Sequence, residues 1–254
     1  MRNRRIYLFQ TGGQYFKKNE LQPHRKRQWC IRKVTAQFLA RLEIILRLYL
    51  QPYQEAYPVV CFDERPCFLI GDVVEGLEMQ PGQVAKENYS YSKHGSCCVL
   101  AAIEPLTGKR LAHVRTKRKK KQFALFMQDL AKQYPNAKRI KVVLDNLNTH
   151  GYSAFYETFD AQTAAELTEK IEFIFTPKNA SWLNMIEIEF SVLSRQCLNR
   201  RIPCIHKLEA EVLAFFKERS KKAIKINWQF TQHQARKKLN RRYAEVNSVN
   251  LKYK

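Results

Sequence analysis

The chain has 254 residues, 45 % of them hydrophobic and 12 % aromatic, and its 45 Lys and Arg against 23 Asp and Glu give a net charge of +22. This composition excludes a disordered chain, and the positive excess indicates a polyanionic partner, for which DNA or RNA is the usual choice. No apolar stretch has the length of a membrane span or of a signal-peptide core, so we expect a cytoplasmic protein with no membrane partner. The seven cysteines are odd in number and include no CxxC pair, so they indicate neither a disulfide framework nor a zinc knuckle.

The first 33 residues are strongly basic. They contain ten Lys and Arg but one acidic residue, Glu20, and a Gly12-Gly13 pair interrupts the stretch. Such a segment is either a basic arm or linker that lies along nucleic-acid phosphates or a solvated tail. Charge alone does not decide between these alternatives.

A helix is predicted over Val34–Leu50, because its apolar residues recur at spacings of three and four and Pro52 follows it. We interpret residues 34–56 as a linker helix and residues 57–203 as the main domain. Residues 204–254 form a basic helical C-terminal segment in this interpretation.

The main domain begins with a short apolar strand, Val59–Phe62, which leads directly into Asp63 and Glu64. Pro66 is expected to end this strand, since proline cannot donate to a sheet ladder. Residues 72–95 are expected to form a mostly irregular excursion.

Two further strands, Ser96–Ile103 and Lys109–Thr116, are separated by turn residues and predict a hairpin. A basic run over 117–121 comes next. It is followed by a helix predicted at Gln122–Tyr134, whose aromatic and aliphatic residues share one face.

The next strand is the most informative one. Its apolar residues, Ile140–Leu144, run straight into Asp145 and a polar loop that ends at His150. A carboxylate at the end of a buried strand is costly unless it is paired or holds a cation. Asp145 is therefore a candidate for chemistry, although an Asp at this place can also simply cap a turn.

The rest of the chain is mainly helical. Helices are predicted at 153–159, 161–170, 184–200, 208–216 and 229–243, and a short strand at 171–175. Strand, hairpin, crossover helix and strand in this order indicate an α/β fold.

Three acidic residues stand out as a possible metal-binding set: Asp63, Asp145 and Glu187, the last on the helix at 184–200. Two strand-end carboxylates and one from a helix over the sheet can hold two hard divalent cations for phosphodiester chemistry. Glu64, Asp72 and Glu189 are rival acids. Glu187 and Glu189 point about 200° apart around a helix, and spacing does not decide which of them faces the site.

Three blocks of sequence resemble a known family: VVCFDERP at 59–66, VLDNLNTH at 143–150 and PKNASWLNMIEIEFSVLSRQCLNRR at 177–201. In this order they resemble the IS630-type transposases, within the Tc1/mariner group of D-D-E transposases, over roughly Leu39–Tyr243. The resemblance implies an RNase H-like core, a mixed central sheet flanked by helices, at 57–203. It places the catalytic, metal-binding acids at Asp63, Asp145 and Glu187, since Glu187 falls in an Asn-x-Ile-Glu block.

The activity that this resemblance implies is DNA transposition. Members of the family cleave transposon ends with Mg²⁺ or Mn²⁺, two ions being expected here, with water as the nucleophile. The freed 3′-hydroxyl then attacks target DNA. The expected partners are transposon-end and target DNA, and a second copy of the chain in a homodimer on paired ends.

The sequence departs from the family in two places. The 41 residues between Asp145 and Glu187 are more than in many Tc1/mariner relatives, and the segment 161–170 accounts for the excess as an insertion. Family members usually begin with paired helix-turn-helix modules, and residues 1–33 are too few and too irregular for them. We therefore expect an N-terminally truncated copy with an intact triad.

Basic residues near these blocks are the candidate DNA contacts, with a solvated surface as the alternative for each. They are Lys117, Arg118, Lys119, Lys120, Lys121, His150, Arg195, Arg200 and Arg201. A DNA-binding remnant without catalysis, inert or inhibitory, is the main alternative function. An RNase H-like nuclease with another substrate is disfavoured by the second and third blocks.

Overall fold

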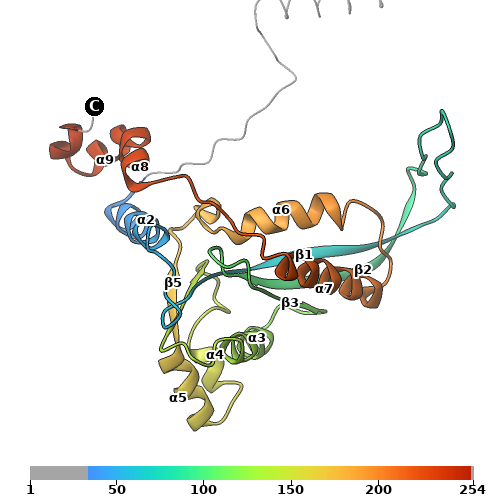
Figure 1. Cartoon of the computed structure of the whole chain (residues 1–254). Coiled ribbons are helices and arrows are strands. Elements are labelled where there is room, and N and C mark those ends of the chain that lie inside the picture. The colour runs from blue at the N-terminus through green and yellow to red at the C-terminus, as the bar shows by residue number, and fades with distance from the viewer. Residues whose placement is uncertain (1–33, 253–254) are drawn as a thin grey trace, which may run out of the picture. The chain divides into compact units, whose positions relative to one another are not determined.

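The structure is a computed structural model that describes residues 34–252, so the expectation for the basic arm at 1–33 lies outside the described residues. Within the described part, the central element is a five-stranded sheet in the order β3-β2-β1-β4-β5 (Figure 1). Its strands are β1 (Val59–Asp72), β2 (Tyr91–Ile103), β3 (Arg110–Arg115), β4 (Ile140–Leu144) and β5 (Ile171–Phe175). Strand β2 is antiparallel to both β1 and β3, whereas β4 is parallel to both β1 and β5. The expected mixed sheet is confirmed.

One face of the sheet is covered by three helices, α3 (Lys120–Lys132), α4 (Ser153–Tyr156) and α5 (Ala161–Lys170) (Figure 1). The main hydrophobic core lies beneath them. Phe62 of β1, fully buried, packs with its ring centroid 5.5 Å from that of Phe123 and 4.9 Å from that of Phe126, both on α3. Burial of such aromatic side chains supplies much of the free energy that holds a helix on a sheet.

The opposite face carries α6 (Ile186–Gln196) and α7 (Ile205–Lys221), which follow the short helix η1 (Ser181–Leu183) along the chain (Figure 1). Helix α6 contacts β1 and β2, and α7 contacts β3. This arrangement places α6 over the strand that carries Asp63.

The helix expected as a linker, α2 (Ala36–Tyr49), is packed into the fold. Leu42, Ile45 and Leu46 have no exposed surface. The Tyr49 hydroxyl donates to the Leu183 carbonyl at 2.8 Å, which ties α2 to the segment before α6.

The C-terminal part forms α8 (Gln232–Lys238), α9 (Asn240–Val246) and η2 (Ser248–Lys252). A single continuous helix over 229–243 was the wrong expectation, because the chain leaves helical geometry at Leu239, where φ is −104° and ψ is 17°. In the described residues, 34–252, no helix is both long and apolar enough to cross a membrane.

Pro66 does not end β1, contrary to the prediction. The strand continues to Asp72, and Pro66 pairs with Cys98 of β2. Strand β4 pairs with β1 over Val59–Cys61, so Pro66 lies where β1 has β2 as its neighbour on one side. A strand position of this edge type tolerates proline.

Candidate active site

Side chains of β1 alternate between the two faces of the sheet, and this alternation separates two neighbouring acids. Phe62 packs on the α3 side, so Glu64 shares that side, whereas Asp63 points to the side that α6 covers. Asp63 is 8 % exposed. It is therefore a buried carboxylate beneath the helix that carries Glu187.

The register of the parallel strands places the second acid beside the first. Cys61 of β1 pairs with Val143 of β4. Asp63 and Asp145 each lie two residues further along, on the same face and at the same edge of the sheet. The Asp145 side chain is 31 % exposed, so this edge opens to solvent.

Electrostatics shows that Glu187 belongs to the same cluster. Burial, with the charges of Asp145 and Glu187, raises the pKa of Asp63 to about 7, against a hydrogen bond from the Glu64 N–H. Burial also raises the pKa of Glu187, with Asp145 adding to the effect and Arg65 opposing it. The structure thus brings together the three acids singled out in the sequence.

The rival acid Glu189 has a different environment. Its side chain is 1 % exposed and forms ion pairs with Arg110 of β3 at 2.8 Å and Arg219 of α7 at 2.9 Å. Although burial opposes ionisation, these two guanidinium groups hold its pKa below the ordinary value. Glu189 therefore fastens α6 to its neighbours while Glu187, on the exposed side of the first turn, is turned toward the other acids.

Asn184 connects the two elements that carry Asp63 and Glu187. It is 1 % exposed, and its Nδ2 donates to the carbonyl of Phe62 at 2.8 Å. Phe62 directly precedes Asp63, and Asn184 lies one helical turn before Glu187. The hydrogen bond consequently fixes the start of α6 relative to β1.

A second polar group lies behind Asp145. His150 has a fully buried side chain, with Nδ1 2.7 Å from Asp145 Oδ1 and Nε2 3.4 Å from Glu64 Oε1. Its ring stacks on Phe123 with centroids 4.8 Å apart. Burial alone would lower the pKa of His150, but the two carboxylates raise it to about 9. This burial does not fit the expected direct DNA contact, because the imidazole lies behind the carboxylates.

The other two rival acids, Glu64 and Asp72, also form ion pairs. Glu64 is buried and pairs with Arg118, whose Nε lies 3.2 Å from its Oε2. Asp72 pairs with Arg201 at 2.7 Å. Both are on β1, but neither contributes to the electrostatics of Asp63 in the way that Asp145 and Glu187 do.

The basic residues expected to contact DNA fall into two groups. Arg118, Lys120, Arg200 and Arg201 form ion pairs with acidic side chains. Arg201 also donates to the carbonyls of Ser90 and Asn88, so it holds the β1–β2 hairpin in place. Lys117, Lys119, Lys121 and Arg195 are exposed and remain candidates for phosphate contacts.

The donor chemistry of the three acids fits a hard divalent cation. Carboxylate oxygens are the ligands that Mg²⁺ prefers, and a cation relieves the mutual repulsion that raises the pKa of Asp63 and Glu187. In the described part of the chain, no group of three or more His, Cys, Asp or Glu side chains is placed so that it could hold a metal ion. His150 also engages one oxygen of Asp145. The three acids therefore match a divalent cation in the type of their donor atoms, whereas their side chains are not gathered around one ion position.

Comparison with known proteins identifies the class. Residues 58–209, more than half of the chain, match the family model described as DDE superfamily endonuclease. The chain belongs to this superfamily. No curated protein matches the sequence significantly.

The fold is similar to solved structures of a mariner transposase, Mos1. The Mos1 mariner paired end complex with Mg matches with a TM-score of 0.57 at 14 % identity, over 95 % of this chain and 70 % of that chain. The corresponding complex with Mn gives 0.55 at 13 %, over the same shares. The Mos1 strand transfer complex gives 0.55 at 11 %, over 87 % and 71 %. At such identities the likeness shows the fold, which is RNase H-like as expected.

Sequence reasoning missed Arg65 and the contacts that Asn184 and Glu64 make at the site. Arg65 shares the Asp63 face of β1, and its charge lowers the pKa of Glu187. Asn184 joins α6 to β1, and Glu64 supports His150. Alternation along β1 could have assigned Arg65 to the catalytic face, whereas the other two contacts join segments far apart in the sequence.

Proposed function

We propose that the chain is a transposase of the IS630 group, which cleaves DNA at transposon ends and joins the freed 3′-hydroxyl to target DNA. The observation that carries this proposal is the electrostatic coupling of Asp63, Asp145 and Glu187 at one edge of the sheet. Membership of the DDE superfamily and the RNase H-like fold support the same chemistry.

Asp63, Asp145 and Glu187 would hold Mg²⁺ or Mn²⁺, two ions being expected. When bound, these ions supply activation of the attacking oxygen and stabilisation of the leaving oxygen. Asp63, whose pKa is about 7, would be a ligand in its ionised form, so its affinity for a cation would rise with pH. His150 orients Asp145 from behind, and Asn184 keeps α6 against β1.

The DNA would approach the open edge of the sheet. Arg65 lies on the same face as the acids and offers positive charge to a phosphate. The exposed basic residues Lys117, Lys119 and Lys121 extend this charge along the backbone of the duplex. Water, and then the 3′-hydroxyl, act as nucleophiles, so the reaction passes through no covalent protein–DNA intermediate.

The chain would act as a homodimer on paired transposon ends, in a prokaryotic cytoplasm. The β1–β2 hairpin extends well beyond the helices in Figure 1 and offers a contact surface for a second copy. Its exposed apolar residues are Phe68, Val73, Val74, Leu77, Met79, Val84 and Tyr89. Exposed apolar surface of this extent is typical of an interaction site. The paired-end complexes of Mos1 support the stoichiometry by analogy.

Nicking of supercoiled plasmid tests the function without a known end sequence. We expect the purified chain to nick DNA with Mn²⁺ and to stop when EDTA is added. Asp63→Asn and Glu187→Gln should each lower nicking by at least about 100-fold, since each removes one charged metal ligand. Glu245→Gln changes an exposed acid paired with Arg242 and serves as the matched control.

DNA binding measured on the same samples separates the outcomes. Binding retained in Asp63→Asn with nicking lost supports a catalytic role of the acid. Binding by the unaltered chain without EDTA-sensitive nicking would overturn the proposal in favour of an inert DNA-binding remnant.

A further inference from the structure

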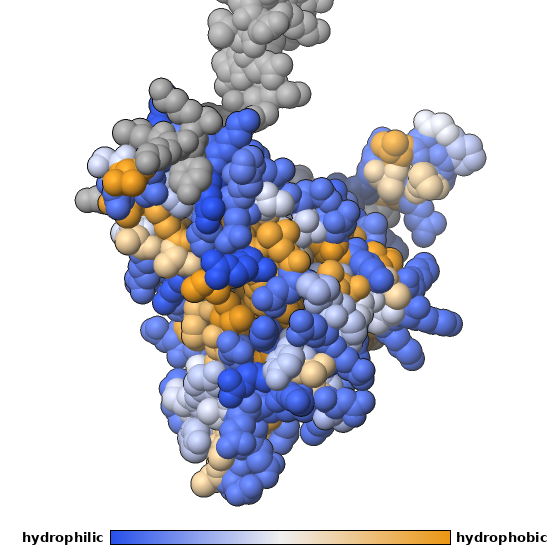
Figure 2. Space-filling model, turned by 60° about the vertical axis from the view of Figure 1, so that its left-hand side comes forward, coloured by the Kyte–Doolittle hydropathy of each residue, from blue (hydrophilic) through white to orange (hydrophobic). Residues whose placement is uncertain are grey.

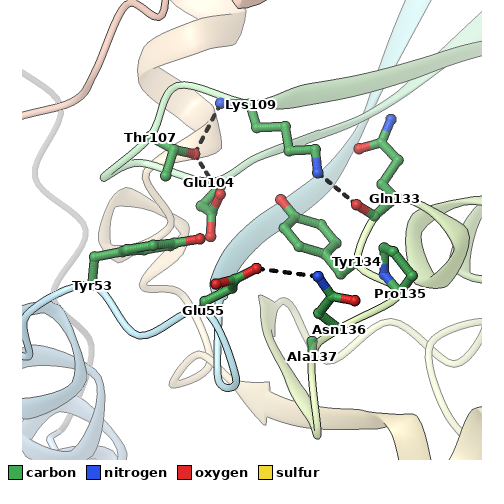
Figure 3. Close-up of a pocket in the computed structure, with 10 residues that line it drawn as sticks. All are labelled: Tyr53, Glu55, Glu104, Thr107, Lys109, Gln133, Tyr134, Pro135, Asn136 and Ala137. Atoms are coloured by element: carbon green, nitrogen blue, oxygen red, sulfur yellow. Dashed lines mark hydrogen bonds between the residues drawn. The ribbon is translucent and has the colours of Figure 1, made fainter.

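A second polar site lies at the other end of the strands. A pocket of 390 Å³ is lined by residues that precede β1 and β4 and that follow β2, including Tyr53, Glu55, Glu104, Lys109, Gln133 and Tyr134 (Figure 3). Strands β1 and β4 run parallel, and β2 ends where β1 begins, since Ile103 pairs with Cys61. The pocket is therefore at the N-terminal ends of β1 and β4, whereas Asp63 lies within β1 and Asp145 follows the C-terminal end of β4.

The pocket contains buried acceptor atoms that lack donors. Glu104 is 2 % exposed, and its Oε2 accepts a hydrogen bond from the Thr107 hydroxyl. Among the described residues, the Tyr134 hydroxyl interacts with the Glu104 carboxylate, but no hydrogen bond of good geometry reaches Glu104 Oε1 or the side-chain oxygen of Gln133, both of which are buried. An acceptor buried without a donor costs free energy. A ligand that relieves this cost must bring N–H or O–H groups.

The charge and the rings of the pocket favour a cation as that ligand. Glu55 and Glu104 outnumber Lys109, which makes the pocket acidic on a chain whose net charge is +22. Figure 3 shows the hydroxyl ends of Tyr53 and Tyr134 directed toward the Glu104 carboxylate. Burial raises the pKa of Glu104, and a neighbouring cation would stabilise the ionised form.

The ammonium group of Lys109 already occupies part of the pocket. The Lys109 ammonium lies 4.2 Å from the centroid of the Tyr134 ring and donates to the Gln133 carbonyl. This contact is an attractive cation–π pair. It shows that the wall formed by Tyr134 accommodates an alkylammonium group, and it also places Lys109 as a competitor for any added cation.

We propose that this pocket binds an organic cation that carries N–H donors, namely an alkylammonium or guanidinium group, with Glu104 as its counter-ion. A free polyamine and a Lys or Arg side chain of a protein both present this chemistry. The proposal does not depend on the transposase activity, because none of its residues belongs to the acidic cluster.

Isothermal titration of the full chain with spermidine and, separately, with N-acetyl-argininamide tests the site. We expect saturable binding of at least one probe, at least about tenfold weaker in Glu104→Gln, where the charge is lost and the shape is kept. Glu166→Gln, an exposed acid on α5, should bind as the unaltered chain does. Lys109→Met should bind several-fold more tightly, because the competing ammonium is gone.

The probes also distinguish the source of the cation. Tighter binding of spermidine supports a free polyamine, and tighter binding of the argininamide supports a basic side chain. Tetramethylammonium, which has no N–H group, should bind much more weakly than either, and equal affinity would overturn the proposed requirement for N–H donors. No saturable binding, or binding unchanged in Glu104→Gln, would also overturn the proposal. If Glu104→Gln does not fold by circular dichroism, Glu55→Gln and Lys109→Met decide the outcome in its place.

Discussion

His150 is the residue whose environment differs most from its sequence context. A histidine in a polar loop is usually solvated, yet this imidazole is buried between Asp145 and Glu64 and stacked on Phe123. Two carboxylates next to it make the charged form the favoured one. The same charge steadies Asp145, which would otherwise repel Asp63 more strongly.

The stability that His150 contributes should depend on pH. Its pKa is about 9 in the folded protein and 6.5 ordinarily, so the folded state binds the proton more tightly. The contribution is therefore complete below pH 6.5 and is lost as pH rises through about 9. In EDTA, we expect the free energy of unfolding of His150→Gln to be lower than that of the unaltered chain by about 2 kcal/mol at pH 6, and by much less at pH 9.5.

Urea unfolding at the two pH values measures this difference. A steric effect of the substitution would be the same at both values. A difference between the two proteins that does not shrink at pH 9.5 would therefore contradict the ionic role of His150.

At the scale of elements, α6 carries two acids with separate tasks. Glu189 is buried between Arg110 and Arg219, whereas Glu187 is exposed beside Asp145 and Asp63. Removing one partner of a buried ion pair leaves an uncompensated charge. We expect Glu189→Gln to lower the free energy of unfolding by about 3–5 kcal/mol. Glu187→Gln should leave it within about 0.5 kcal/mol and abolish nicking.

Thermal and urea unfolding of the two variants, side by side with plasmid nicking, checks this division. The pair is internally matched, because both changes convert a glutamate on the first turn of the same helix. Equal stability of the two variants would contradict the assignment of Glu189 as the anchor.

The C-terminal helices are attached to α2 through one carboxylate. Glu43 accepts hydrogen bonds from Arg236 at 2.8 Å, from Tyr243 at 2.7 Å and from Gln232 at 2.7 Å. Hydrogen bonds to a charged group are worth about 1.5–3 kcal/mol. We expect Glu43→Gln to raise amide exchange over 232–246 and to leave exchange in β1 and β4 unchanged.

Hydrogen–deuterium exchange by mass spectrometry resolves these segments. Glu245→Gln, which alters an exposed pair with Arg242 on α9, should exchange like the unaltered chain. Uniform deprotection of the sheet in Glu43→Gln would show instead that α8 and α9 form one cooperative unit with the core.

At the scale of the whole molecule, the net charge of +22 predicts salt-dependent DNA binding. The face seen in Figure 2 is hydrophilic over much of its area, and its hydrophobic side chains gather mainly across the middle. The logarithm of the binding constant should fall linearly with the logarithm of salt concentration. Lys117→Ala should reduce this slope by about 1, because one phosphate contact is lost.

Arg201→Ala is the matched control for that measurement. Its guanidinium is committed to Asp72 and to the carbonyls of Ser90 and Asn88, so we expect an unchanged slope and a less stable hairpin. Fluorescence anisotropy with a labelled duplex at several salt concentrations gives both slopes. A slope change in Arg201→Ala as large as in Lys117→Ala would contradict the separation of exposed from paired basic residues.

The sequence by itself determined most of the elements and the chemical class of this protein. Periodicity placed α5 and β5 at the bounds that the structure has, because both segments repeat their apolar residues in a regular local pattern. Asp63 and Asp145 were visible because each directly follows a short apolar run. The blocks around them and around Glu187 led to the family that the comparison confirmed at the level of the DDE superfamily.

The family resemblance favoured Glu187 over Glu189, but only the tertiary structure showed the contacts that separate the two acids. The distinction between Glu187 and Glu189 depends on Arg110 and Arg219, which come from other elements. The burial of His150 depends on Phe123, on which its ring stacks. Strand β1 continues past Pro66 because β4 pairs with β1 only over Val59–Cys61. These outcomes follow from contacts between segments distant in sequence, which local periodicity does not contain.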